Sequence, residues 1–431
     1  MNEEKSTPLE AARAVLRSYM TDAGRTAARN LSWLAVLSVL AQLCSLGSTF
    51  FLLSEWGRDD FGVLGFALSI QAYLTIFGTL GTKRIVIREA AGRPHELDVV
   101  LTSHLVITAA ASTLALVVTS IVVSILPMAR TEQVLIAILA LGNVAACVNI
   151  RGFFDVHHRQ PTSAAISVAS EVLGLAVVVG LAYVERLTLV NVGIVFAAKW
   201  SLSTTLHYLF YHLSIRPIQL VLSATNIRQM LASSWSLLLS GLVARTPLNA
   251  GVFFVRAFHT EGDVAFMFVA QRVARAYTTF TTIGDRILRP HIAGRYGMYA
   301  SFVRKLAVFY AAFRGLIFVA ALTAVSLVIL WLPDTSYRLA IAPIAILMFS
   351  KLINGIGNLG TMYAVVLHRE RIVLLSGICS SAVFVVGCLA LVPQYTYNGA
   401  AVAAVFASLT SAALIVRAVR AAYLEKTGRL G

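Results

Sequence analysis

Charged residues are scarce in this sequence: Asp, Glu, Lys and Arg make up only 13% of its 431 residues. Soluble domains carry about one quarter charged residues, whereas this chain is 58% hydrophobic, with a mean hydropathy of +0.79. The composition excludes an ordinary soluble domain and predicts an all-α, polytopic membrane protein. We therefore interpret the net charge of +15 first as a signal of membrane topology, not as an affinity for nucleic acid.

The features of a catalytic or metal site are also lacking. The four cysteines lie far apart in apolar stretches, at Cys44, Cys147, Cys379 and Cys388. Their placement excludes a disulfide framework and a thiolate metal site. His104, His157 and His158 have no carboxylates at metal-ligand spacing. No glycine-rich phosphate loop and no Ser/His/Asp arrangement is present, so we expect neither an enzyme nor a metal or other cofactor.

Twelve apolar runs are each long enough to cross a hydrocarbon layer of ~30 Å. Six precede and six follow a polar segment at 213–233. They predict two six-helix lobes, at 31–212 and 234–418, with an N-terminal segment at 1–30 and a tail at 419–431. The runs lie at roughly 31–53, 62–81, 99–127, 132–150, 163–184, 188–212, 234–255, 263–284, 306–332, 336–363, 372–393 and 397–418.

The basic residues favour one orientation in the membrane. With both termini in the cytosol, 24 Lys and Arg lie inside, 5 lie outside and 6 lie within spans, as the positive-inside rule requires. The charged N-terminal segment lacks the apolar core and cleavage site of a signal peptide. No outside loop exceeds about a dozen residues, which leaves no room for an external catalytic domain.

The two lobes resemble each other in sequence. The first and seventh spans open with the same Ser-Trp pair, and the second and eighth share a Gly, a Phe and a Gln at equal spacing. These matches predict a parallel repeat about an axis along the membrane normal, with a binding site between the lobes. The matched positions are Ser32-Trp33 with Ser234-Trp235, and Gly62, Phe66 and Gln71 with Gly262, Phe266 and Gln271.

Six cations lie within the predicted spans, against a single deep acid, Glu171. Each cation at the centre of a span costs ~3 kcal/mol, so six that faced lipid would cost roughly 15–20 kcal/mol. That exceeds the stability of a typical domain, and Glu171 can neutralise only one of them. We therefore expect a central, hydrated and positively charged cavity that binds an anion. The six cations are Lys199, Arg245, Arg272, Arg275, Arg314 and Lys351.

Helical spacing places these cations on polar faces of their spans. The faces predict further cavity-lining residues, and a proline between Arg245 and Asn249 predicts a kink that serves as a hinge. Glu171, on a serine stripe of the fifth span, is our candidate for ion coupling. The predicted lining residues are Gln71, Asn249, Thr279, Asn354 and Asn358, and the predicted hinge is Pro247.

Several of these residues have plainer interpretations. Arg314 and Lys199 can snorkel to an interface, and the polar stripes of the second and fifth spans suit ordinary interhelical hydrogen bonds. Glu171 is either a proton-coupling group or the static partner of a cation such as Lys199. Pro247 is either a hinge or a static kink.

A stretch at residues 56–91, "WGRDDFGVLGFALSIQAYLTIFGTLGTKRIVIREAA", resembles the region that joins the first two spans of polysaccharide-biosynthesis flippases. Trp56 stands where that family often has leucine. With twelve spans in two lobes, the chain is most similar to the O-antigen (lipid-linked oligosaccharide) flippases of the multidrug/oligosaccharidyl-lipid/polysaccharide exporter superfamily. The matching positions are Trp56-Gly57, Phe61-Gly62, Gly78, Gly81, Arg88 and Glu89.

The resemblance implies movement of an undecaprenyl-pyrophosphate-linked oligosaccharide across the bacterial inner membrane by alternating access. Implied partners are that lipid-linked oligosaccharide, membrane lipids, a polysaccharide polymerase and glycosyltransferases, and no nucleic acid. Closely spaced arginines suit pyrophosphate because the guanidinium fork binds phosphate oxygens in pairs.

Three alternatives stay open. A lipid II-type flippase is expected to hold two further spans, a cation-coupled multidrug exporter is expected to carry cavity carboxylates, and a membrane polymerase or ligase is expected to carry a large external loop.

Overall fold

The computed structural model describes residues 22–294, 300–366 and 370–426, and every regular element in these ranges is a helix. The elements of the N-terminal half are α2 (Asp22–Glu55), α3 (Arg58–Thr79), α4 (Thr82–Gly92), η1 (Pro94–Glu96), α5 (Leu97–Ile125), α6 (Arg130–Cys147), α7 (Arg151–Val156), α8 (Gln160–Tyr183) and α9 (Leu189–Ser214). Those of the C-terminal half are α10 (Ala224–Asn249), α11 (Gly251–Phe258), α12 (Glu261–Gly294), α13 (Ala300–Leu330), η2 (Thr335–Ala340), α14 (Ile341–Val366) and α15 (Glu370–Lys426).

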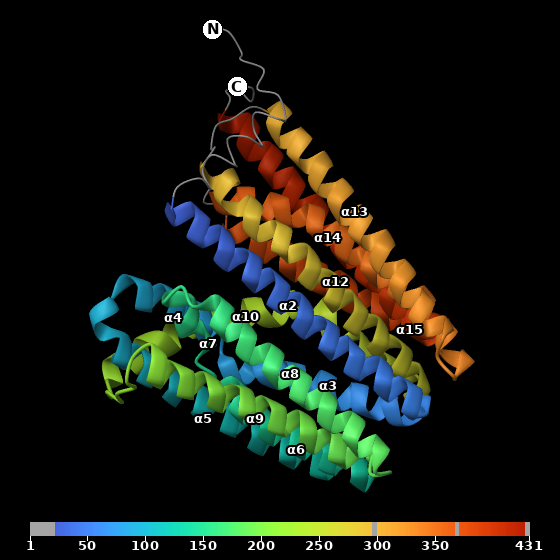
Figure 1. Ribbon diagram of the computed structural model, residues 1–431. Coiled ribbons are helices and arrows are strands. Elements are labelled where there is room, and N and C mark those ends of the chain that lie inside the picture. The colour runs from blue at the N-terminus through green and yellow to red at the C-terminus, as the bar shows by residue number, and fades with distance from the viewer. Residues whose placement is uncertain (1–21, 295–299, 367–369, 427–431) are drawn as a thin grey trace.

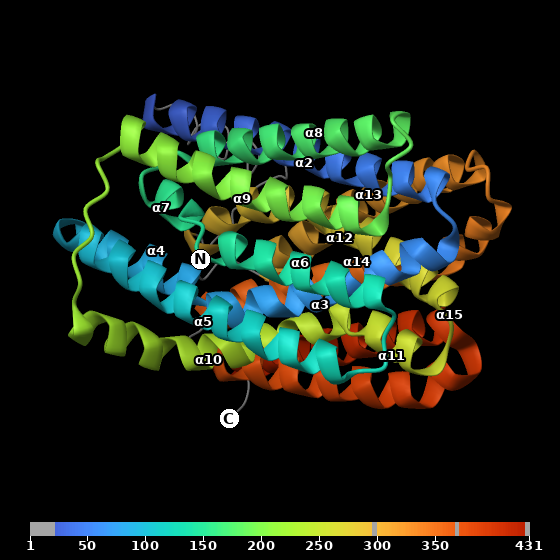
Figure 2. The same ribbon diagram turned by 90° about the horizontal axis from the view of Figure 1, so that it is seen from below.

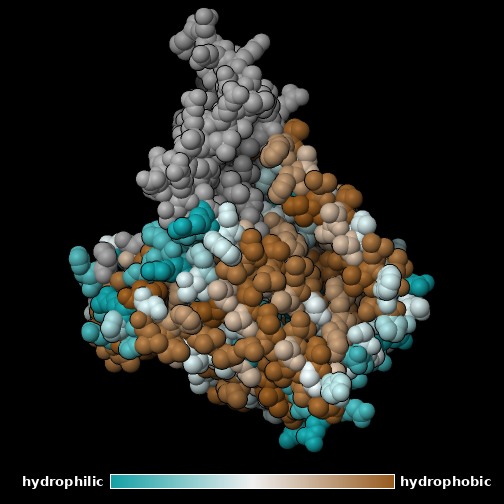
Figure 3. All heavy atoms as spheres, viewed as in Figure 1, coloured by the Kyte–Doolittle hydropathy of each residue, from teal (hydrophilic) through white to brown (hydrophobic). Residues whose placement is uncertain are grey.

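The helices form two bundles that meet along α2, α3 and α12 (Figure 1). We call α2–α9 the N bundle and α10–α15 the C bundle. Long side chains such as Leu114 and Trp331 are exposed, and Figure 3 shows a broad hydrophobic face with hydrophilic residues at its margins. Exposing so large a hydrophobic surface is favourable in contact with lipid and unfavourable in contact with water. The predicted all-α, polytopic membrane architecture is therefore confirmed.

The number of spans differs from the expected twelve. Nine helices in the described ranges are long and apolar enough to cross a membrane, or ten if α10 and α11, which meet at 56°, count as one broken span. The charged helix α12 is not among them, and 372–421 counts as one segment. Within α15, Thr396 has a non-helical conformation (φ 52°, ψ −135°), so α15 is two helices joined at a sharp kink.

The two ends of the molecule differ in how the bundles meet. At one end, which we call the α11 end, Gly62 of α3 packs on the backbone of Glu261, and a Cβ atom at Gly262 would lie 2.9 Å from Asp59. Only glycine allows the backbones to approach this closely. Gly62 and Gly262 are the positions that the two halves share in sequence, so the structure places them on opposite sides of one contact, as expected of a duplicated unit.

At the other end, which we call the α4 end, α10 extends toward the N bundle. It begins at Ala224, ten residues before the expected span, and lies alongside α5 (Figure 2). Asn226 donates to Ser103 over 2.9 Å, and the preceding loop is held by an ion pair of 2.5 Å between Arg216 and Asp98. The α4 end of α10 is therefore attached to the N bundle, while α11 packs against α15.

Candidate substrate-binding site

Arg272 and Arg275 lie on the face of α12 that meets α2 and α10. Arg272 donates to the Ser45 hydroxyl of α2 over 3.3 Å, and its guanidinium lies 5.1 Å from the centre of the Phe268 ring. Arg275 donates to the Asn249 side chain of α10 over 2.9 Å and remains exposed. Thr279 extends the same face and donates to Gln42 of α2 over 3.3 Å. Arg272, Arg275 and Thr279, which are spaced three and four residues apart in the sequence, thus form one polar face of α12 between the bundles.

Two further cations complete a group that we call the central cation cluster: Arg245, Arg272, Arg275 and Lys351. Arg275 lies close enough to Arg272, Arg245 and Lys351 for their charges to interact. None of the four forms an ion pair with an acid of the described ranges. Like charges inside a low-dielectric protein repel each other, so the cluster is stabilised when an anion or water occupies the space between them.

Glu171 and Lys199 form an ion pair at the edge of this cluster. Lys199 Nζ lies 2.9 Å from Glu171 Oε2 and 4.6 Å from the centre of the Phe196 ring. Its methylene stem packs on Gly174 of α8. Glu171 also interacts electrostatically with Arg272. The ion pair with Lys199 is present in this conformation, and ion coupling through Glu171 stays a prediction.

Arg314 lies elsewhere, in the packing between α13 and α14. It is 2% exposed, donates to the Lys351 carbonyl oxygen over 3.4 Å and lies 4.8 Å from the centre of the Tyr310 ring. Its guanidinium fills the space left by the missing side chain of Gly355. Arg314 thus contacts the backbone of Lys351 from within the packing of α13 and α14, and we leave it out of the proposed site.

A methyl group at Gly355 tests this placement. A Cβ atom there would overlap the Arg314 guanidinium, so we expect Gly355→Ala to lower the free energy of unfolding by about 1–3 kcal/mol through overpacking. Gly315→Ala is the matched control, because no atom lies within 4 Å of its added carbon and alanine favours the helix. Thermal unfolding of the two purified variants measures the difference. Equal melting temperatures would contradict this packing.

The remaining residues that we predicted to line the cavity differ in burial and in hydrogen bonding. Asn249 is buried and bonded to Arg275, while Asn354 and Asn358 are half-buried on α14, one and two turns beyond Lys351. Gln71 is taken up by interhelical hydrogen bonds: its amide donates to Thr75 over 3.0 Å and to Asn143 over 3.1 Å. Gln71 thus holds α3 against α6, which was the plainer interpretation of this stripe, whereas Thr75 and Thr79 of the same stripe line a cavity between the bundles.

A cavity of about 840 Å³ reaches Arg245 from the α4 end. It lies between α3 and α4 of the N bundle and α10 and α15 of the C bundle, and Lys83 and Arg84 line it as well. Neither Asp nor Glu is among its lining residues in the described part of the chain. The sequence assigned Lys83 and Arg84 only to membrane orientation, because nothing in their spacing shows that α4 turns back toward the gap between the bundles.

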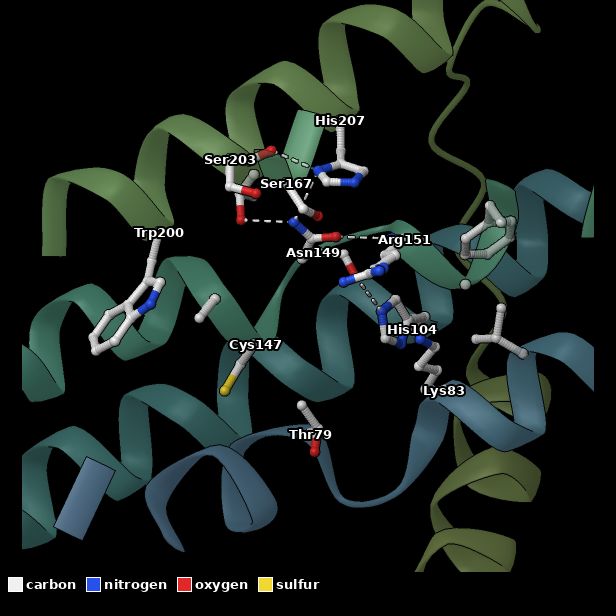
Figure 4. A pocket seen from close by; sticks show the side chains of 15 residues that line it. Thr79, Lys83, His104, Cys147, Asn149, Arg151, Ser167, Trp200, Ser203 and His207 are labelled. Carbon is white, nitrogen blue, oxygen red and sulfur yellow. Dashed lines mark hydrogen bonds between the residues drawn. The ribbon is translucent and has the colours of Figure 1, made fainter. Parts of the chain in front are cut away.

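A smaller cavity of about 250 Å³ lies inside the N bundle (Figure 4). Its polar groups largely satisfy one another: His104 bonds to Thr82 over 3.0 Å, and Asn149 donates to Thr204 over 3.0 Å. His207 bonds to the Ser203 carbonyl oxygen over 2.6 Å. Such a closed network stabilises the packing of a bundle. The central cation cluster, none of whose members forms an ion pair in the described ranges, is the better candidate for binding.

Pro247 breaks the hydrogen-bond ladder of α10 beside the cluster. A proline has no N–H group to donate to the carbonyl oxygen four residues earlier, which here belongs to Val243. The Ser381 hydroxyl of α15 donates to that oxygen instead, over 2.6 Å. α10 continues through Pro247 to Asn249, and the 56° bend to α11 follows directly after it. A neighbouring helix satisfies the freed carbonyl, and the hinge stays a prediction.

Comparison with known proteins agrees with this architecture. Residues 27–283 match the family described as "Polysaccharide biosynthesis protein", and no curated protein matches the chain significantly. Lipid II flippase MurJ in an inward closed conformation is similar in structure, with a TM-score of 0.69 and 10% identity, over 91% of this chain and 87% of that one. An outward-facing multidrug resistance MATE family transporter of the MOP superfamily gives a TM-score of 0.60 and 14% identity, over 93% and 97%.

A MATE transporter from Vibrio cholerae gives a TM-score of 0.57 and 13% identity, over 96% of this chain and 98% of that one. Identities this low establish the fold alone. The family match covers more than half of the sequence. The chain therefore belongs to the polysaccharide biosynthesis protein family and is a membrane protein with the fold of MATE and MurJ transporters.

Proposed function

We propose that this protein is a flippase that moves an undecaprenyl-pyrophosphate-linked oligosaccharide from the cytosolic to the periplasmic leaflet of a bacterial inner membrane. The central cation cluster is the observation that carries the proposal. Arg275 lies close to Arg245, Arg272 and Lys351, and none of the four forms an ion pair with an acid in the described ranges, so a pyrophosphate would neutralise them. Arginine forks bind its oxygens in pairs.

The substrate has three parts, and the arrangement suits each of them. The pyrophosphate binds Arg272, Arg275, Arg245 and Lys351, with Lys199 and Glu171 at the edge of the site. The sugars occupy the cavity of about 840 Å³ that leads to Arg245. The polyprenyl chain remains in the bilayer, because transferring its apolar surface into a hydrated cavity would be unfavourable.

The topology of the proposal is twelve spans with both termini in the cytosol. The nine helices, the bent α10–α11 pair, α12 and the second half of α15 supply the twelve. The α4 end is then cytosolic and the α11 end periplasmic. The close packing of the bundles at the α11 end makes this conformation closed to the periplasm, with Lys83, Arg84 and Arg245 along the cytosolic approach.

Two other cargoes fit the fold. A lipid II-type cargo also carries pyrophosphate and would bind the same cluster, so only its sugars distinguish it. A cationic drug would meet an excess of positive charge at Arg245, Arg272, Arg275 and Lys351, which repels it. We therefore place the lipid-linked oligosaccharide first and the cationic drug last.

Flipping in vesicles of purified protein tests the function. Fluorescent polyprenyl-pyrophosphate oligosaccharide is expected to move between leaflets at least tenfold faster than in empty vesicles, and a neutral glycolipid with the same sugars is expected not to. Equal movement of both lipids, or a rate equal to that of empty vesicles, would refute the function.

Ion coupling through Glu171 gives a second prediction. Glu171→Gln removes the carboxylate that pairs with Lys199 and keeps the shape of the side chain. If proton binding there drives the cycle, the variant is expected to lose most of the acceleration that a pH gradient gives to flipping, while its uncoupled rate persists. Flipping with and without a gradient measures this. An unchanged response to the gradient would leave Glu171 only its role as the partner of Lys199.

A further inference from the structure

Arg256 of α11 lies between acids from both bundles. Its guanidinium is 3.4 Å from Glu132 Oε2, at the start of α6 in the N bundle. It also forms an ion pair with Glu261, at the start of α12 in the C bundle. Phe66 of α3 lies against it, with 5.7 Å between the guanidinium and the ring centre. One side chain therefore joins the two bundles at the α11 end.

The two acids differ in their access to water. The Glu261 side chain is 40% exposed, whereas that of Glu132 is only 3% exposed. Glu132 Oε1 has no hydrogen-bond partner in the described ranges. A buried carboxylate is unfavourable unless it is paired. The first turn of α6 gives Glu132 some support from the helix dipole, and Arg256 is its one ion-pair partner in the described structure.

The pair lies within the contacts that close the α11 end. Phe61 and Phe268 pack with their ring centres 5.7 Å apart, and Gly62 packs on the backbone of Glu261. If these surfaces separate, Arg256 and Glu132 must separate too. Water then reaches Glu132, and Arg256 keeps Glu261, which belongs to its own bundle. In the separated state Glu132 is hydrated and Arg256 stays paired with Glu261. Because neither charge is then buried alone, the contact can break and form again.

We infer that Arg256 and Glu132 form an ionic latch between the bundles that favours the conformation closed at the α11 end, and that Glu261 holds Arg256 when the latch opens. The use of this latch rests on the proposed function, in which closure at the α11 end seals the site from the periplasm. The latch itself is a property of the conformational equilibrium without cargo. It can therefore be tested separately from transport.

The experiment measures the distance between two spin labels in lipid nanodiscs without cargo. Cysteines replace Ser54 at the end of α2 and Ala257 on α11, both exposed, in a background lacking the four native cysteines. Glu132→Gln is expected to raise the long-distance population at least fivefold. Arg256→Gln, at a more accessible position, is expected to do the same and keeps the test open if Glu132→Gln fails to fold.

Glu261→Gln is the matched control, because it removes an acid from the same guanidinium without breaking the contact between bundles. Its long-distance population is expected not to exceed that of the unsubstituted protein, because glutamine no longer holds Arg256 in the open state. An unchanged distribution in both Glu132→Gln and Arg256→Gln would overturn the latch. So would an opening as large in Glu261→Gln as in Glu132→Gln. Failure of flipping with an intact response of the labels would count against the proposed function and not against the latch.

Discussion

Alanine at both Arg272 and Arg275 is expected to lower flipping of the lipid-linked oligosaccharide by at least about a hundredfold. Each charge-assisted hydrogen bond contributes about 1.5–3 kcal/mol, and two lost contacts correspond to roughly two to four orders of magnitude in affinity. Both side chains lie on one face of α12 between the bundles. The double variant also loses the hydrogen bonds to Ser45 and Asn249, so the amount of inserted protein has to be measured beside transport.

Surface polysaccharide in a strain that depends on this protein provides the measurement, with the amount of protein in the membrane determined in parallel. Arg130→Ala with Arg186→Ala is the matched control: it also removes two arginines, both exposed and far from the cluster in sequence. Lysine at 272 and 275 is expected to restore part of the activity, because it keeps the charge and loses the paired donors. Normal polysaccharide from the double alanine variant would remove both arginines from the proposed site.

The sequence predicted the helical architecture and the shared face of Arg272 and Arg275 because both depend on local periodicity. Apolar length determines which segments enter a membrane, and a spacing of three or four residues determines which side chains lie on one face of a helix. The same rules placed Lys351 near Arg275, since both were expected on inward-facing stripes. The contact of Arg275 with Asn249 followed from neither rule. It requires knowing how α10 crosses α12.

Arg314 shows where this reasoning stops. Nothing in the sequence predicts what Arg314 contacts, and its surroundings include a carbonyl oxygen, a tyrosine ring and a glycine on another helix. Glu132 and Arg256 are the converse case. Both lie at the ends of predicted spans, 132–150 and 234–255, where charges are ordinary, and only the packing of the bundles buries Glu132 against Arg256.

Restoring a straight ladder in α10 is expected to slow transport by at least about tenfold, because Pro247 allows this helix to belong to both bundles. Its α4 end is bonded to α5 through Asn226 and Ser103, and α11, beyond the 56° bend, packs with the C bundle. If the bundles move relative to each other, the chain must therefore bend between Asn226 and α11, the segment that contains Pro247. Pro247→Ala supplies an N–H group for the Val243 carbonyl oxygen and stiffens that point.

Ser381→Ala separates a hinge from a static kink. It removes the hydroxyl that bonds to the Val243 carbonyl oxygen and is expected to lower the free energy of unfolding by about 1 kcal/mol while transport continues. Single cysteines along residues 240–250, in a background lacking the native cysteines, report access from each side of the membrane. With Pro247 present, lipid-linked cargo is expected to change labelling on one side of the bend and not on the other. With alanine at 247 that difference is expected to vanish. If cargo leaves labelling along the whole segment unchanged with Pro247 in place, the bend only shapes the cavity, and the bundles must move about another point.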